Sequence, residues 1–120
     1  VIMEEYYMNL AIKQANKAQK KGEMPVGAII VLNNKIIGKG YNKKEKTKNA
    51  LMHAEIIAIQ KACKRKKDWR LNDCTLYVTM EPCMMCCGAI EQSRIKKIIY
   101  GVKNENYGFR RWLKNNRNSN

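Results

Sequence analysis

Two short fragments, well separated along the chain, constrain its fold more than any other feature. The first is His53-Ala54-Glu55 and the second is Pro82-Cys83-Met84-Met85-Cys86. Both lie where a predicted strand or loop passes into a predicted helix, and Cys83 and Cys86 have the i, i+3 spacing of neighbours on one helical face. Because side chains lean toward a helix N-terminus, first-turn residues reach the space that caps the helix. A fold that uses both fragments together must therefore bring the starts of two helices side by side.

The residue types in these fragments point to a metal. His53, Cys83 and Cys86 form a set of three ligands that suits zinc. Three protein ligands with a fourth, open position is the pattern of catalytic rather than structural zinc sites. Helix N-termini favour negative charge and so help to keep the two thiols deprotonated. We therefore expect one Zn²⁺ per chain, with Glu55 as the general base that takes a proton from water at the open position.

Each piece of this pattern has a simpler interpretation when it stands alone. A single C-x-x-C can be a redox pair, although thioredoxin-like sites usually carry proline between the cysteines rather than before the first. A zinc ribbon needs a second C-x-x-C, which Cys63 and Cys74 do not form. His53 alone would suit a packed core histidine. We interpret Cys63 and Cys74 as buried thiols. We interpret Cys87 as a packing residue, with a role as an additional metal ligand as the alternative.

The hydrophobic pattern predicts an α/β protein. Apolar residues at helical spacing indicate helices, while short apolar or alternating runs between turn residues indicate strands. We predict helices over residues 4–20, 53–65 and 83–92, strands over 26–32, 35–41, 74–79 and 95–100, and a polar loop over 42–49. The first two strands flank Asn33-Asn34 and should form a hairpin. The last two are separated by a helix and should be parallel, which gives a mixed sheet layered with helices.

Length and composition bound the class of protein. With 120 residues we expect one domain over 1–104 and a basic tail over 105–120. There is no apolar run of membrane-span length and no signal-peptide pattern. Five cysteines, an odd number, argue against a disulfide framework and favour the reducing cytoplasm. The formal charge of +14 suits a polyanionic partner such as nucleic acid, but a lysine-rich genome bias would explain it equally well.

Longer strings around the two fragments resemble a known family. The H-x-E and P-C-x-x-C fragments occur throughout the zinc-dependent cytidine deaminase-like superfamily. The flanking strings are similar to those of the bacterial tRNA-specific adenosine deaminases, over roughly residues 4–104. These strings are Met24-Pro25-Val26-Gly27-Ala28, Gly38-Lys39-Gly40-Tyr41-Asn42, Trp69-Arg70-Leu71, Thr75-Leu76-Tyr77-Val78-Thr79-Met80-Glu81, Ser93-Arg94-Ile95 and Tyr100-Gly101.

The resemblance implies a three-layer α/β/α fold, a homodimer, and conversion of the wobble adenosine of a tRNA anticodon to inosine. It assigns zinc binding and proton transfer to the residues named above. On the substrate side, it implies that Asn42 hydrogen-bonds the flipped purine, and that Val26 and the backbone at Ala54 line its pocket. Without the family, Asn42 would be interpreted as a turn residue and Val26 as a core residue.

The chain departs from the family pattern after its fourth strand. Family members usually continue with a glycine-rich segment, a further strand and a C-terminal helix. No counterpart is evident, so we expect these elements to be missing or divergent. Cations with an aromatic residue follow instead and would suit either an RNA contact or a frayed, solvated tail. They are Arg110, Arg111, Trp112, Lys114 and Arg117.

Two other functions remain open. A deaminase of a free base or nucleoside, of the guanine or cytosine type, would use the same metal site in a closed pocket and would not need a basic surface. A non-catalytic, zinc-stabilised RNA-binding module would need no carboxylate beside an open coordination position, so Glu55 argues against it. The preferred prediction is a deaminase that acts on a tRNA anticodon loop, where bases are already partly unstacked.

Overall fold

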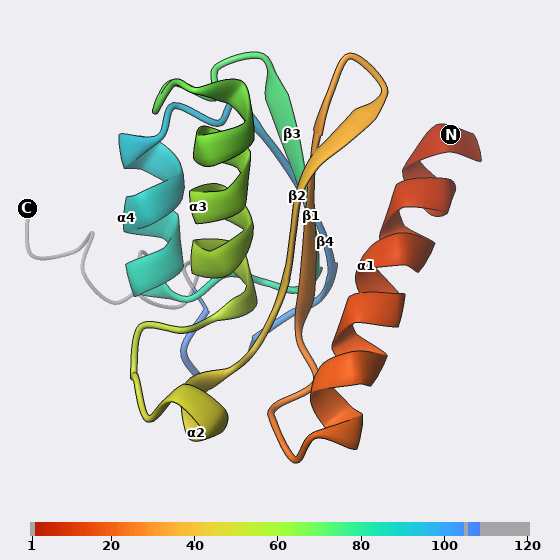
Figure 1. Ribbon diagram of the computed structural model, residues 1–120. Helices are drawn as coiled ribbons and strands as arrows, with labels where there is room; N and C mark the ends of the chain where they lie inside the picture. Colours follow the sequence, from red (N-terminus) through yellow and green to blue (C-terminus); the bar gives the residue numbers. More distant parts are fainter. Residues whose placement is uncertain (1, 105, 109–120) are drawn as a thin grey trace, which may run out of the picture.

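The computed structural model of the protein describes residues 2–104 and 106–108. It consists of a four-stranded sheet with helices on both faces (Figure 1). All the predicted helices and strands are present, with limits a few residues from those expected. In chain order the elements are α1 (Ile2–Lys20), β1 (Gly27–Leu32), β2 (Lys35–Tyr41), α2 (Lys44–Thr47), α3 (Ala54–Lys66), β3 (Cys74–Met80), α4 (Met84–Gln92) and β4 (Lys97–Val102).

The sheet directions decide where the functional fragments meet. The strand order is β2-β1-β3-β4, with β1 antiparallel to both β2 and β3, and β3 parallel to β4. The hairpin and the parallel final pair are therefore confirmed. Because β2, β3 and β4 run in the same direction, their C-terminal ends share one edge of the sheet with the start of β1. Loops that leave these strands, and the helices that follow them, are gathered at that edge.

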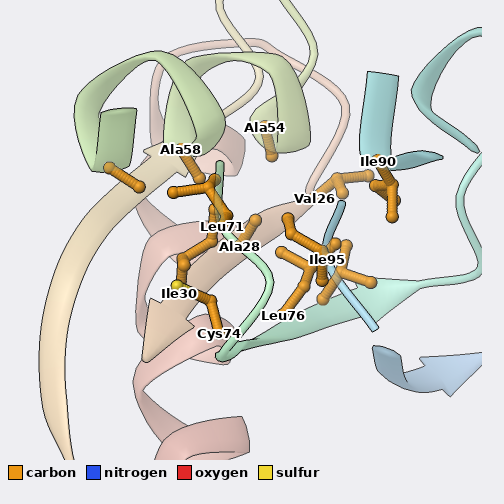
Figure 2. Close-up of a cluster of buried hydrophobic side chains, with 12 residues drawn as sticks. Val26, Ala28, Ile30, Ala54, Ala58, Leu71, Cys74, Leu76, Ile90 and Ile95 are labelled. Atoms are coloured by element: carbon orange, nitrogen blue, oxygen red, sulfur yellow. The ribbon is translucent and has the colours of Figure 1, made fainter. Parts of the chain in front are cut away.

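The molecule has the predicted three layers. Helix α1 covers one face of the sheet, and α3 and α4 lie side by side on the other (Figure 1). Successive side chains of a strand point to opposite faces, so β1 contributes to two hydrophobic clusters. Ala28 and Ile30 belong to the cluster beneath α3 and α4, which Figure 2 shows, while Ile29 and Val31 pack against α1.

Glycine allows both helical layers to approach the sheet closely. Gly40 on β2 faces the start of α3, where an added Cβ would lie 2.5 Å from the carbonyl oxygen of Ala54. Gly27, at the start of β1, is in contact with the backbone of α1, and a Cβ there would overlap the carbonyl oxygen of Ala11. The first of these contacts sets the position of the His53 fragment, because Ala54 begins the helix that follows it.

The segment predicted as a loop over residues 42–49 instead contains the short helix α2. The carboxylate of Glu23 caps it, since Oε1 accepts a hydrogen bond from the N–H of Glu45 (3.0 Å) and Oε2 from that of Lys46 (2.8 Å). These bonds lower the pKa of Glu23, the Glu45 N–H most strongly. Because the cap comes from a distant part of the chain, the local sequence carried no sign of the helix.

Other expectations concern the ends of the elements. Strand β4 begins at Lys97 rather than at Ile95, because the N–H of Ile95 binds the carbonyl of Ile90 in α4 and pairing with β3 starts only at Lys97. The side chain of Ile95 is buried in the core shown in Figure 2. The predicted tail over 105–120, including its cations, lies outside the described residues except for 106–108, so the division into domain and tail stays a prediction. Among the helices of residues 2–104, none combines the length and apolar character that crossing a membrane requires.

We expect substitution of Gly27 by alanine to destabilise the fold, because the new methyl group would push α1 away from β1. Overpacking of this kind costs about 1–3 kcal/mol. Gly88 is the matched control, since it lies in α4 with no neighbouring atom within 4 Å of an added Cβ. Gly88→Ala should instead raise the free energy of unfolding by about 0.5–1 kcal/mol through helix propensity. Urea denaturation of both variants checks this, and an unchanged unfolding midpoint for Gly27→Ala would contradict the packing.

Candidate metal centre and substrate cleft

Two helix N-caps carry the first two candidate ligands. His53 is the N-cap of α3 and Cys83 the N-cap of α4, both with extended backbone conformation (φ −80°, ψ 157° and φ −75°, ψ 174°). Their carbonyls accept the first helical hydrogen bonds, from Ile57 and Cys87. Neither side chain caps its own helix, as serine or aspartate would at this position. The imidazole and the thiol are therefore available to face each other, with Cys86 in the first turn of α4.

The distances among the three donors fit a tetrahedral zinc ion. The Nδ1 atom of His53 lies 3.7 Å from the Sγ of Cys83 and 3.5 Å from the Sγ of Cys86. Zinc bonds of about 2.3 Å to sulfur and 2.05 Å to nitrogen, at tetrahedral angles, place nitrogen and sulfur about 3.6 Å apart. All three donor atoms lie within 4.8 Å of one another, and no second group of this kind occurs within the described ranges.

Electrostatics already favour a thiolate here. A hydrogen bond from the Cys86 thiol, with a further contribution from His53, lowers the pKa of Cys83 to about 4. The Cys83 thiolate in turn raises the pKa of His53, and it raises that of Cys86, which donates to it. Without a cation, these two thiols together carry only one negative charge. A bound cation would allow the second thiol to lose its proton as well. A divalent cation with two thiolates and an imidazole matches this demand for charge.

The other three cysteines do not join the cluster. Burial raises the pKa of Cys87 to about 12, and its thiol donates to the carbonyl of Pro82. Cys74 is buried, Cys63 is half-buried, and burial raises the pKa of both thiols. Cys74 is therefore the buried thiol that the sequence predicted, whereas Cys63 is only half-buried rather than buried. Neither of these two, nor Cys87, belongs to the donor set.

Glu55 lies beside the donors and is nearly inaccessible, with 4% of its surface exposed. Burial raises its pKa to about 6, and the Cys83 thiolate adds to the rise. Its own backbone N–H, in the first turn of α3, works against that rise. His53 and Glu55 converge because His53 is an N-cap with extended backbone and Glu55 is in the first turn. In a regular helix, an i, i+2 pair would point in different directions.

Asn42 lines the cleft and also binds the start of α3. It follows β2, is 6% exposed, and its Oδ1 accepts a hydrogen bond of 2.8 Å from the N–H of Ala54. Asn42 thereby caps α3 in place of His53. Because the oxygen is used in this way, the amide NH₂ is the group that Asn42 has available for a ligand. Ala54 itself is fully buried behind this wall, so its predicted role in the pocket stays untested.

A cleft of about 710 Å³ opens over the donors, within the size range of small-molecule sites. It lies at the edge of the sheet where β2, β3 and β4 end and β1 begins, which is why segments far apart in sequence contribute to it. Of the predicted site residues, it brings together all except Ala54 and the buried Cys86. Its lining residues are Gly22, Glu23, Met24, Val26, Asn42, Lys44, Glu45, His53, Glu55, Met80, Glu81, Cys83, Lys103, Asn104, Asn106 and Tyr107.

Sequence reasoning missed the wall formed by Glu81 and the residues after β4. Glu81 is buried, and its Oε1 accepts a hydrogen bond of 3.2 Å from the N–H of Asn104. The side chain of Asn104 accepts one from the N–H of Tyr107, and a Cβ on Gly108 would lie 2.7 Å from the Glu81 carboxylate. Glu81 thus holds this turn against the start of α4. The position of Glu81 just before Pro82 was the only sign in the sequence that it lies near the site. That position did not indicate that Asn104 is its hydrogen-bond partner.

Residues 2–102 match the family model described as the cytidine and deoxycytidylate deaminase zinc-binding region. A tRNA-specific adenosine deaminase of Bacillus subtilis is 48% identical over 99 residues, which make up 82% of this chain. The chain spans 62% of the length of that relative.

Two solved structures are similar to the whole architecture. One comes from work on tRNA:A34 deaminases that edit A to I at the wobble position, with 36% identity and a TM-score of 0.84 over 87% of this chain and 75% of the other. The second is a guanine deaminase from Bacillus subtilis, with 34% identity and a TM-score of 0.83 over 92% of this chain and 74% of the other. The fold therefore does not by itself distinguish the two substrates.

The donor set predicts one zinc ion per chain in protein purified without added metal. Cys83→Ser should lower the zinc content, because serine is a poor substitute for a thiolate ligand. Cys63→Ser is the matched control and should leave the zinc content unchanged, since Cys63 lies away from the cluster. Elemental analysis by mass spectrometry measures both. Wild-type protein with almost no zinc, or with iron in its place, would show that the donor set has been misinterpreted.

Proposed function

Because the chain belongs to the cytidine and deoxycytidylate deaminase zinc-binding family, we propose that it catalyses the hydrolytic deamination of adenosine to inosine in RNA, with the wobble adenosine of a tRNA anticodon as its target. The observation that carries this proposal is the buried Glu55 carboxylate beside the His53, Cys83 and Cys86 donors, inside a cleft wide enough for a base. The similarity to proteins named tRNA-specific adenosine deaminase supports the choice of substrate.

The donor set and Glu55 divide the chemistry. His53, Cys83 and Cys86 would hold Zn²⁺, which when bound turns water into a strong nucleophile at neutral pH. Glu55 accepts the proton of the attacking water and delivers it to the ring nitrogen next to C6. A carbon–oxygen bond forms at C6, the bond from C6 to the amino nitrogen breaks, and Glu55 delivers the second proton to the departing ammonia. One water is consumed for each inosine formed.

The cleft walls would position the base. Asn42 offers its NH₂ group to the purine, while its oxygen stays bound to the start of α3. Val26 gives an apolar surface on the neighbouring strand edge, and Tyr107 stands exposed at the opposite wall. The target base must leave its stack to enter the cleft, which costs least in a loop.

A second candidate function is deamination of free guanine, which the similarity to the guanine deaminase supports. Three features favour RNA. The wall facing Asn42 exposes Tyr107, the cleft is lined by Lys44 and Lys103, and the formal charge of the chain is +14. A free base carries no phosphate and would gain little from such a surface. A zinc-stabilised RNA-binding module without catalytic activity would not need a buried carboxylate such as Glu55 beside the metal ligands.

Assembly and location are part of the proposal. We propose a homodimer whose subunits pair near the metal site. Two exposed apolar side chains support this: Leu51 lies just before α3, and Met84 is the first residue of α4. We also propose a cytoplasmic location, the setting in which the unpaired state of all five cysteines is stable.

Replacing Glu55 should separate metal binding from catalysis. We expect Glu55→Ala to keep its zinc, because Glu55 is not one of the donors, while turnover falls by at least ~10²–10⁴-fold, as for loss of a general acid–base group. Glu55→Gln, which keeps the size of the side chain, should be similarly inactive. Zinc content and inosine formation are measured on the same preparations. A variant that lost its zinc would show that Glu55 is a ligand and that the proposed proton transfer is wrong.

Salt dependence should identify the class of substrate. Each phosphate that binds a Lys or Arg releases counterions, so kcat/KM on an anticodon stem-loop with a wobble adenosine should fall by orders of magnitude from low to moderate salt. Activity on free adenosine should be weak at every salt concentration, because backbone contacts supply the energy that positions the base. Efficient turnover of free guanine or a nucleoside, insensitive to salt, would instead establish the second candidate.

Asn42 variants provide a control on the same substrates. Asn42→Ala should slow the stem-loop reaction without altering its salt slope, because Asn42 would contact the base and no phosphate. Since this change also removes a helix cap, Asn42→Asp is the sharper variant. Asn42→Asp keeps the oxygen that binds Ala54 but lacks the NH₂ group. It should therefore fold like the wild type and still deaminate the stem-loop slowly. Full activity of Asn42→Asp would mean that the amide does not bind the base.

A further inference from the structure

A cationic and aromatic surface lies at the end of the molecule opposite the cleft. The connection after α3 carries Trp69 and Arg70, and the turn after α4 carries Arg94, followed by Lys96. We call these four residues the distal cluster. The cleft lies over the N-termini of α3 and α4, and the cluster at their C-terminal ends, so the length of α3 separates them by about 20 Å. None of the four contributes to the metal site or the cleft.

Both arginines of the distal cluster stack on the same indole ring. The guanidinium carbon of Arg70 is 4.6 Å from the centre of the Trp69 ring, and that of Arg94 is 5.5 Å away. Trp69 remains 49% exposed. A shallow hollow of about 400 Å³ adjoins the stack, and Lys96 also lines it. A Trp ring that orders two arginines lowers the entropy that a ligand would have to overcome when it binds their N–H groups.

Most of the donors in the distal cluster stay available. Arg94 uses one N–H to bind the carbonyl of Glu91 at 3.1 Å, and a guanidinium has five. Arg70 forms an exposed ion pair with Asp68 at 3.1 Å, which is of the weak kind found at surfaces. Glu91 lines the hollow and Asp73 follows Arg70 in the same connection, but among the described residues only Asp68 forms an ion pair with the cluster. Arg94 and Lys96 therefore have no carboxylate partner within the described ranges.

The C-terminal half of α3, which adjoins the distal cluster, is also positive. Lys61, Lys64 and Arg65 have the spacing of one face of α3 and are all exposed. After Glu55, the helix contains no acidic residue. Like charges at i, i+3 and i, i+4 repel each other, so the helix keeps this row at some cost in stability. The C-terminal half of α3 therefore extends the positive charge of the cluster toward the cleft, as far as Lys61.

We propose that the distal cluster is a second RNA-binding surface, which contacts backbone phosphates of the polynucleotide through Arg70 and Arg94 while the target base occupies the cleft. The inference rests on the proposed function, because it takes RNA as the substrate. Phosphate contacts of this kind fix the register of a nucleic acid without reading its sequence, and stacked arginines are well suited to make them. The cluster strengthens binding and takes no part in the reaction itself.

The test compares two double variants of the full chain. Arg70→Ala with Arg94→Ala removes the stacked pair, while Lys13→Ala with Lys17→Ala removes two exposed charges from α1 on the opposite face. The probe is a fluorescent RNA stem-loop with adenosine at the wobble position, titrated at several salt concentrations. We expect the cluster variant to bind about tenfold more weakly, with a salt slope smaller by about 1.4–1.8, which corresponds to two phosphates. The α1 variant should bind almost as the wild type does.

Asp68→Asn gives a result that misfolding cannot imitate. It keeps an oxygen for the Arg70 N–H but releases the guanidinium charge, so the RNA should bind more tightly. Turnover of saturating RNA should stay at the wild-type rate in all these variants, because the cluster lies far from the reacting base. Zinc content provides a second check that each variant is folded.

Three outcomes would overturn the proposal. The cluster variant could bind like the wild type, or the α1 variant could lose as much affinity, which would indicate a diffuse charge effect. Light scattering could show that the cluster variant changes its mass instead, which would make this surface a contact between copies of the chain. If the wild-type protein deaminates the stem-loop and the cluster variants bind it normally, only the inference about the distal cluster is contradicted. Wild-type protein that neither binds nor deaminates RNA contradicts the proposed function as well.

Discussion

The structure depends on holding two helix N-termini next to each other at one edge of the sheet. His53 and Cys83 are both N-caps whose side chains do not cap their own helices and instead face a shared space. A glycine on β2 lets α3 approach the sheet, and the parallel arrangement of β3 and β4 puts the start of α4 at the same edge. The fields of two helix ends then favour the negative charge that two thiols carry on binding a divalent cation.

Buried polar side chains from elsewhere in the chain fix the walls around this centre. Asn42 caps α3, Glu23 caps α2, and Glu81 holds the turn that begins at Asn104. Each accepts hydrogen bonds from backbone N–H groups, so each is satisfied although little exposed. The cleft is therefore shaped by these three anchors rather than by the strands alone, and a change at any of them alters a wall without touching a metal ligand.

One similar solved structure comes from work on tRNA:A34 deaminases and another is a guanine deaminase, so the fold alone does not decide between a base in RNA and a free base. These substrates differ in the carbon that carries the amino group, which is C6 in adenine and C2 in guanine, and in the surface that they require around the cleft. Here that surface exposes Tyr107 on one wall and brings Lys44 and Lys103 to the cleft, and further cations lie on the C-terminal half of α3. Attraction for a polyanion over such a distance suits a substrate much larger than a base.

Local spacing within the sequence was enough to single out His53, Glu55, Cys83 and Cys86 as candidates, and the structure places all four near the starts of two helices. The strands and the longer helices could also be predicted, since their apolar periodicity reflects burial in a layered sheet. Contacts between residues distant in sequence decided the rest. Helix α2 exists because Glu23 caps it, Asn42 owes its orientation to Ala54, and Glu81 meets Asn104 only because β3 and β4 end together. No local pattern encodes such pairs, because each partner looks like an ordinary surface or turn residue until the sheet brings both to one edge.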